Sequence, residues 1–347
     1  MWRGPEHPDP EGDNLLALFD AIQTQRSMGR FPKGSFAVFI DWCSLCQKDE
    51  NGTRTAAERE SFDTALNRMQ LWYGHELTLV YLLSATPAGW DDVVPYSERG
   101  WPSFERCVAQ LNKRQSRKCW ANVVDVSAPG SGLSVPLSTE AFTALVRSKV
   151  FTSGSDKALV VELYDTTLKT ALGEATKMRY VGMSWGDDDL KQLLDVMETV
   201  GCKQLLRLNL KGKNNRFTDA ASEHLANFLN DVKKLPALRV LGAGCTAIDA
   251  KDDGILMQNE NLKRACQKRN ISLCRDASCT HLAASANAAA AAFSAKKASF
   301  VEFSGRARTS INEGRAVVTE RIKPLPTGVG GAFKWMSSRV RRERRGR

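Results

Sequence analysis

Two uninterrupted apolar runs constrain the fold of this chain most. Residues 36–40 end at Asp41, and residues 77–83 lead into the acidic and aromatic segment 96–105. Strands that are apolar at every position are typical of parallel sheets with both faces covered. The carboxyl ends of such strands meet at one edge, where open α/β sheets bind ligands. We therefore expect a site that combines Asp41 with the residues before and after Trp101.

Strand and helix alternate up to residue 126, which predicts an α/β fold over residues 1–127. We expect an open parallel sheet of flavodoxin-like type, with strands 36–40, 77–83 and 121–126 and helices 13–28, 55–73 and 102–112. A Pro/Gly/Ser cluster at 128–132 indicates a boundary. Residues 128–176 then form a helical connector, with helices expected at 140–146 and 156–174.

A template of three apolar residues, L-x-x-L-x-L, recurs after the connector. Its copies begin at Met178, Leu205 and Leu235, and an amphipathic helix with an acidic start follows each of the first two. A short strand followed by a helix at this period is typical of a leucine-rich solenoid, which we expect over residues 177–276. The alternative is a pair of ordinary βα units. A solenoid of this type would expose its strands to a protein partner.

The net charge of +10 is concentrated at the carboxyl end of the chain. Of the 49 basic and 39 acidic residues, 14 and 4 follow His281, which leaves 35 of each sign before it. Residues 277–347 are of low complexity, and we expect them to be mostly disordered. Their arginines would contact a polyanion, either nucleic acid or acidic lipid, or serve in nuclear import: Arg339, Arg341, Arg342, Arg344 and Arg345. The alternative is a solvated charge run without a partner.

The nine cysteines and the apolar content bear on location. No apolar run reaches the roughly 18 residues of a membrane span, and residues 1–10 lack the apolar core of a signal peptide. We therefore expect a protein of the cytoplasm or nucleus with reduced thiols. The pair Cys43 and Cys46 has the spacing of redox or zinc sites, but no second ligand pair is suitably placed. We favour structural thiols and predict no metal site.

The order of motifs in residues 12–126 resembles the Toll/interleukin-receptor-like superfamily, and within it the branch of fungal heterokaryon-incompatibility domains. The matching residues are Ile40-Asp41, Gln47, Met69 with Tyr73, and Trp101 with Glu105. The family pattern also places a strand ahead of the first helix, and residues 1–12 contain no such run. Residues 178–248 separately resemble ribonuclease-inhibitor-type leucine-rich repeats.

The superfamily resemblance implies a catalytic role for one residue. In its catalytic members the glutamate of the Trp-x-x-x-Glu segment takes part in cleaving the nicotinamide–ribose bond of NAD, and this role falls on Glu105. Its carboxylate would stabilise the oxocarbenium-like charge of the transition state. The candidate NAD-binding residues are Asp41, Gln47, Arg99 as a pyrophosphate clamp, and Trp101 as a stacking platform.

Each of these assignments has a structural alternative. Glu105 would equally suit the first turn of a helix, where the macrodipole favours a carboxylate. Asp41 would cap the loop after a strand, and Arg99 would form a surface ion pair. We expect an intracellular recognition or signalling module that acts through protein–protein interaction. The alternative is an NAD-cleaving hydrolase.

Overall fold

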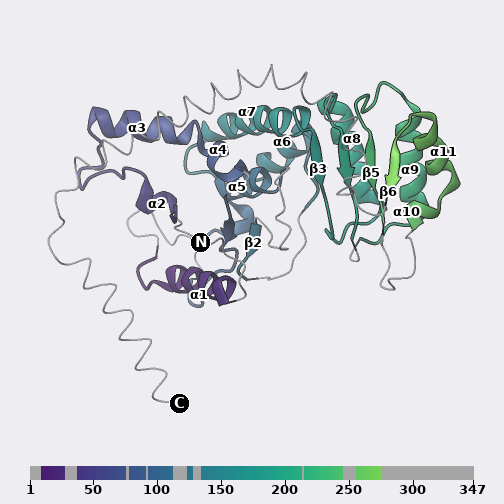
Figure 1. Cartoon of the computed structure of the whole chain (residues 1–347). Coiled ribbons are helices and arrows are strands. Elements are labelled where there is room, and N and C mark those ends of the chain that lie inside the picture. Colours follow the sequence, from purple (N-terminus) through teal and green to yellow (C-terminus); the bar gives the residue numbers. More distant parts are fainter. Residues whose placement is uncertain are drawn as a thin grey trace, which may run out of the picture. The chain divides into compact units, whose positions relative to one another are not determined.

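A computed structural model of the chain describes eight stretches of residues, all within the unit formed by residues 1–278. They are residues 9–27, 37–75, 78–90, 93–111, 123–127, 134–212, 215–244 and 255–274. These residues form a mixed α/β structure with two short parallel sheets (Figure 1). Residues 275–347, which include the whole predicted basic tail, lie outside the described residues, as do residues 128–133 at the predicted domain boundary.

The smaller sheet contains β1 (Val80–Leu82) and β2 (Val123–Asp125). The two strands are parallel, with Val80 opposite Val123 and Leu82 opposite Asp125. This confirms the parallel pairing predicted for 77–83 and 121–126. Helix α5 (Gly100–Ala109) lies between the two strands in the sequence.

The prediction of a third strand at 36–40 is wrong for the residues that the structure describes there, 37–40. Their backbone is extended at Ile40 but forms no strand, and Val38 is 50% exposed. The ring of Phe39 instead packs edge-on against Trp72, with ring centroids 4.2 Å apart. The apolar run therefore reflects side-chain packing on a neighbouring helix, not burial within a sheet.

The amino-terminal helices are α1 (Asp13–Ser27), the short α2 (Asp41–Ser44), α3 (Ala56–Leu66) and α4 (Met69–Gly74). The single helix predicted at 55–73 is thus divided in two. Helix α3 begins with a capping box in which Thr55 and Glu58 bond each other's backbone N–H groups. It ends where the Asn67 side chain donates to the carbonyl of Asp63 at 2.8 Å. The helical pattern breaks at the next residue: the Arg68 N–H donates to the carbonyl of Ala65, and Arg68 has φ −122°, which separates α3 from α4.

Helix α5 follows the 3-10 turn η1 (Tyr96–Glu98) and begins at a glycine. The Gly100 N–H donates to the carbonyl of Val150 at 2.9 Å. A Cβ at Gly100 would overlap the ring of Phe151. The start of α5 is therefore held against residues 150–151 by a contact that only glycine permits.

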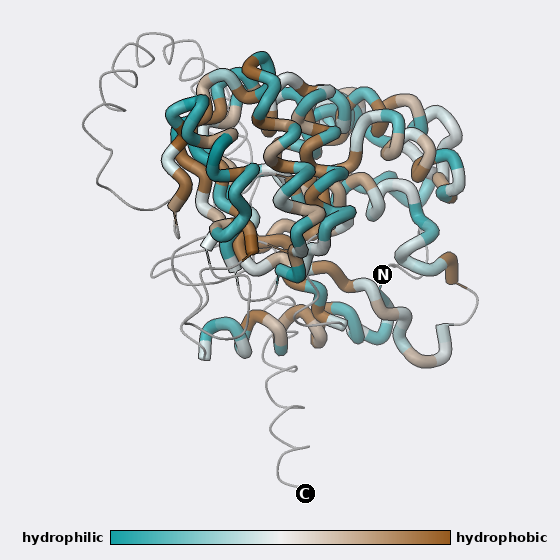
Figure 2. The backbone as a smooth tube through the Cα atoms, turned by 90° about the vertical axis from the view of Figure 1, so that its right-hand side faces the viewer, coloured by the Kyte–Doolittle hydropathy of each residue, from teal (hydrophilic) through white to brown (hydrophobic). Residues whose placement is uncertain are grey.

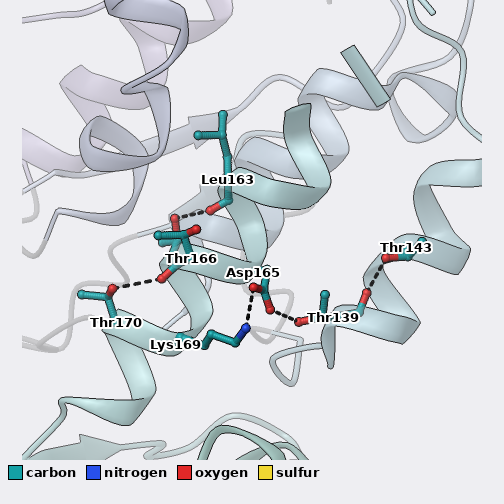
Figure 3. A network of polar contacts seen from close by, with 8 residues as sticks. Thr139, Thr143, Leu163, Asp165, Thr166, Lys169 and Thr170 are labelled. Atoms are coloured by element: carbon teal, nitrogen blue, oxygen red, sulfur yellow. Dashed lines mark hydrogen bonds and ion pairs between the residues drawn. The ribbon is translucent and has the colours of Figure 1, made fainter. Parts of the chain in front are cut away.

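Two further helices, α6 (Thr139–Arg147) and α7 (Asp156–Leu168), pack against α5, and the π-helical segment η2 (Lys169–Gly173) extends α7. Figure 3 shows the polar network that joins α6 and α7. The Asp165 carboxylate accepts hydrogen bonds from Thr139 at 2.7 Å and from Lys169 at 2.6 Å. These bonds hold the pKa of Asp165 below its usual value.

The larger sheet has four parallel strands in chain order: β3 (Lys177–Arg179), β4 (Arg207–Asn209), β5 (Val240–Gly242) and β6 (Ser272–Cys274). Helix α8 (Asp187–Val200) joins β3 to β4, and α9 (Asp219–Asn230) joins β4 to β5. Helices α10 (Ile255–Gln258) and α11 (Glu260–Lys268) precede β6. Figure 1 labels β3, β5 and β6 of this sheet, next to α8, α9 and α11, and β4 pairs with both β3 and β5. The predicted adjacency of parallel strands in this region is confirmed.

The register of the predicted repeat needs correction. Leu208 lies opposite both Met178 and Leu241, and Leu241 lies opposite Leu273. Equivalent positions are therefore 30, 33 and 32 residues apart. If the copy that begins at Leu205 is kept as the reference, the strand pairing moves the start of the first copy three residues earlier than predicted. It moves the start of the third copy three residues later than predicted. Three leucines at spacing three, 235, 238 and 241, satisfy the template in two frames, so the pattern alone does not choose between them.

A hydrophobic core runs from α5 through the larger sheet. Met178, Leu208 and Leu241 point into it and are at most 1% exposed, with the apolar faces of α8, α9 and α11 beside them. Along the helices, hydrophilic and hydrophobic residues alternate (Figure 2), as expected when one face is buried. No helix in the described part of the chain is long and apolar enough to cross a membrane.

Candidate functional site

Three residues from separate helices meet beside the smaller sheet. Glu105 lies in the second turn of α5, and the Tyr73 hydroxyl at the end of α4 donates a hydrogen bond to its carboxyl group. Asp41, the first residue of α2, is close enough for its charge to act on both. The structure therefore brings together Asp41 and Glu105, the two carboxyl groups that the sequence analysis placed at one site.

The environment of Glu105 favours the protonated acid. Burial is the main cause that raises the pKa of Glu105 to about 8, and the Asp41 charge raises it further. The hydrogen bond from Tyr73 acts in the opposite direction. Although Glu105 keeps some exposed surface, its carboxyl group is surrounded by protein. At neutral pH this carboxyl is mostly uncharged.

The Tyr73 hydroxyl remains a neutral hydrogen-bond donor. Burial is the main cause that raises the pKa of Tyr73 well above its usual range, followed by the charge of Glu105. We predicted Tyr73 only as part of a motif and assigned it no role. The sequence did contain a signal for Tyr73: it ends the apolar stripe of the predicted helix, and a buried tyrosine hydroxyl needs a hydrogen-bond partner.

A second tyrosine and a third carboxylate complete the surroundings. Burial raises the pKa of Tyr96, and the charges of Glu105 and Asp125 raise it further. Asp125 ends β2 and accepts a hydrogen bond from Ser84 at 2.6 Å. Asp125 was not among the predicted site residues, although a carboxylate at the end of the run 121–126 fits the reasoning applied to Asp41.

Two predicted NAD-binding residues are engaged elsewhere. The Gln47 side chain is exposed and donates to the carbonyls of Trp42 and Leu45, at 3.0 and 3.1 Å. The Arg99 Nε donates to the carbonyl of Val94 at 3.0 Å. Desolvation lowers the pKa of Arg99. Both side chains hold local backbone in place, and neither is among the groups that act on Glu105.

Trp101 joins two helices. Its Nε1 donates to the Asp156 carboxylate of α7 at 2.9 Å, and its ring meets Phe104 edge-on at 5.7 Å. Phe104 is fully buried in the core. Trp101 therefore holds α5 against α7. Neither of these two contacts is with Tyr73 or Asp41.

The cysteine pair lies next to Asp41, in and after α2. Partial burial raises the pKa of the Cys43 thiol, and the charge of Asp41 raises it further. A raised pKa reduces the thiolate that redox and metal chemistry require. Across the described stretches, no three side chains of the His, Cys, Asp and Glu types gather as a metal site would need.

Two open surface hollows in the described part of the chain lie away from Glu105. One, of about 380 Å³, is lined by Val135, Met183, Trp185 and Asp189 among others. The other, of about 610 Å³, runs along α3 between Arg59, Asp63 and Arg68. Neither is lined by the Asp41, Tyr73 and Glu105 cluster.

Comparisons with known proteins provide no relative for this chain. No model of a known protein family matches it. Searches against curated proteins and against solved structures find no match either.

Proposed function

We propose that this chain is an intracellular recognition or signalling module that acts through protein–protein interaction. In this proposal an α/β domain of Toll/interleukin-receptor-like type precedes a short leucine-rich-repeat segment, and the partner binds on the strands of that segment. The proposed location is the cytoplasm or nucleus.

One observation carries the proposal. The four strands β3 to β6 are parallel, three residues long and adjacent in chain order. Side chains alternate across a strand, so the buried row that begins with Met178 leaves two rows on the other face. The first of these rows runs from Lys177 through Arg207 and Val240 to Ser272. Stacked βα units use such a face to bind proteins.

A photo-crosslinking residue at Ser272 tests this proposal. Ser272 is half-buried in the first outward row. The matched control is the same residue at Gln267, an exposed position of α11. We expect a discrete protein adduct in cells from position 272 and none from position 267. Equal adducts from both positions, or none from position 272, would contradict a partner on the strand face.

The alternative is cleavage of the nicotinamide–ribose bond of NAD, and the meeting of Asp41, Tyr73 and Glu105 favours it. A carboxylate can stabilise the oxocarbenium-like charge that develops on the ribose as the glycosidic bond breaks. With the raised pKa of Glu105, Asp41 would supply the negative charge near the ribose. Glu105, through Tyr73, would position the substrate.

The test is release of nicotinamide from NAD by the purified chain. Under the hydrolase proposal, Asp41→Asn abolishes release, because it removes the anion and keeps the shape of the side chain. Glu98→Gln, at an exposed residue of η1, is the matched control and should not change the rate. Absence of release by the wild-type chain, or equal release by Asp41→Asn, would exclude this role for the cluster.

For residues 277–347 the proposal is binding of a polyanion, either nucleic acid or acidic lipid, through the arginines of 339–347. It depends on the charge count of the sequence, which places the whole net charge after His281. Counterion release would make this binding strongly dependent on salt.

A further inference from the structure

Helix α1 buries one face and leaves a second, apolar face in solvent. Asn14 and Leu18 are buried and mark the face that turns to the rest of the chain. Leu15, Leu16 and Phe19 are each between 42% and 50% exposed. A helix of 15 residues is marginally stable by itself and depends on packing of its apolar side chains. The exposed apolar face of α1 is therefore available to a partner.

The exposed side chains form a row of the kind that packs against another helix. Leu15, Phe19 and Ile22 follow one another at spacings of four and three residues, so they lie on one side of α1. Leu16 widens this row, and Ile22 is half-buried at its far end. Alternate spacings of three and four are those of a coiled-coil seam, in which the apolar rows of two helices interdigitate. The row on α1 therefore fits a facing helix with a row of the same kind.

The charges of α1 are divided between its two ends. Glu11 and Asp13 lie at the amino end, and Arg26 lies in the last turn. All three are exposed, and Arg26 forms no ion pair within the described residues. When two copies of α1 pack antiparallel with Phe19 at the twofold axis, position 26 of one copy is level with position 12 of the other. Each Arg26 then lies beside the acidic end of the facing helix.

We propose that two copies of this chain associate through α1, with the two helices antiparallel and Phe19 at the twofold axis. Such an interface is isologous, because the same row and the same charges serve on both sides. One pair of short helices buries less surface than the roughly 1,600 Å² of a standard interface. The association is therefore weak and depends on concentration. It does not depend on a partner at the strand face of the larger sheet.

The charges of this segment favour a second copy over other occupants. Residues 9–27 carry four acidic residues and one basic residue. Acidic lipid and nucleic acid both carry negative charge, so they are repelled by this segment. A different protein would need an apolar row on a helix together with a cation level with Glu11 and Asp13. The second copy supplies both, in Leu15, Phe19 and Arg26.

The first experiment is sedimentation velocity of the full chain over a series of concentrations. The test variant is Phe19→Glu, and the matched control is Val232→Glu, which places the same charge at an apolar residue that is 60% exposed and outside α1. We expect the wild-type chain to form a dimer as its concentration rises. Phe19→Glu should raise the Kd of the dimer at least about tenfold, and Val232→Glu less than about twofold.

Two results of this experiment would overturn the proposal. One is a wild-type chain that stays monomeric up to about 0.2 mM. The other is a dimer with the same Kd in Phe19→Glu and Val232→Glu. Residues 275–347 are present in every variant, so a dimer held together by them would give this second result.

A charge exchange tests the antiparallel arrangement. Arg26→Glu and Glu11→Arg each place like charges level with one another, so each should raise the Kd about three- to tenfold. The double variant, Arg26→Glu with Glu11→Arg, restores opposite charges and should return the Kd to within about twofold of the wild type. A change in the stability of α1 alone would not be reversed in this way. Single variants with the wild-type Kd, or a double variant as weak as the single ones, would overturn the arrangement.

Discussion

Replacing Asn215 by alanine is expected to destabilise the larger sheet. Asn215 is 1% exposed and lies between β4 and α9. Its Oδ1 accepts hydrogen bonds from the backbone N–H groups of Met183 and Trp185, at 3.0 and 3.3 Å. Its Nδ2 donates to the carbonyl of Leu210 at 2.8 Å. One side chain thus ties the chain after β4 to the turn after β3.

The magnitude follows from these three bonds. The substitution removes the bonding partner of three buried backbone groups, and each such loss costs roughly 1–3 kcal/mol, so we expect the free energy of unfolding to fall by at least about 3 kcal/mol. Against a typical stability of about 5–15 kcal/mol the change is large.

Urea unfolding followed by circular dichroism measures this change. We expect a lower midpoint for Asn215→Ala with an unchanged slope, because the surface exposed on unfolding stays the same. The control is Asn230→Ala, the same substitution at an exposed position at the end of α9. A midpoint for Asn215→Ala within the range of Asn230→Ala would refute the account of the three bonds.

Four other changes test separate parts of the structure. Leu208→Asp places an unpaired charge at a fully buried position and should cost about 3–5 kcal/mol, unfolding the segment in a thermal melt. Gly100→Ala forces Phe151 to move and should cost about 1–3 kcal/mol in urea. Glu105 binds its proton more tightly when folded, so wild-type stability should fall as pH rises from about 5 to 8. Glu105→Gln should remove that fall, and a parallel pH profile would refute the protonated state. Truncation at His281 should lower the salt needed for elution from heparin, and unchanged elution would show that the tail does not bind it.

Most of the helices and strands were predictable because their signals are local. The helices from Asp13, Thr139, Asp187 and Asp219 begin within one residue of apolar stripes and caps visible in the sequence. Strand β6 was missed because Leu273 follows Ile271 without the earlier part of the template. The division of the helix at 55–73 was missed because hydrophobic periodicity does not reveal the change of backbone conformation at Arg68 that separates α3 from α4.

The failure at 36–40 has a different cause. A short apolar run suits a buried strand and an extended segment packed on a helix equally well. Only the position of Trp72 relative to Phe39 distinguishes the two, and that is a tertiary contact. The prediction that Asp41 approaches Glu105 nevertheless agrees with the structure, since the run still ends beside α4 and α5. The approach of Asp41 to Glu105 was therefore predicted partly for a wrong reason, namely a strand at 36–40.

The charge state of Glu105 separates the two proposed functions most sharply. A glutamate that stabilises an oxocarbenium-like transition state must be ionised, whereas burial and Asp41 keep Glu105 mostly protonated at neutral pH. Nicotinamide leaves NAD as a neutral molecule and needs no proton from a general acid. Glu105 therefore suits a hydrogen bond to Tyr73 that joins α4 to α5 better than it suits the catalytic role taken from the resemblance. Any hydrolase activity would then depend on Asp41, which is why Asp41→Asn is the decisive variant.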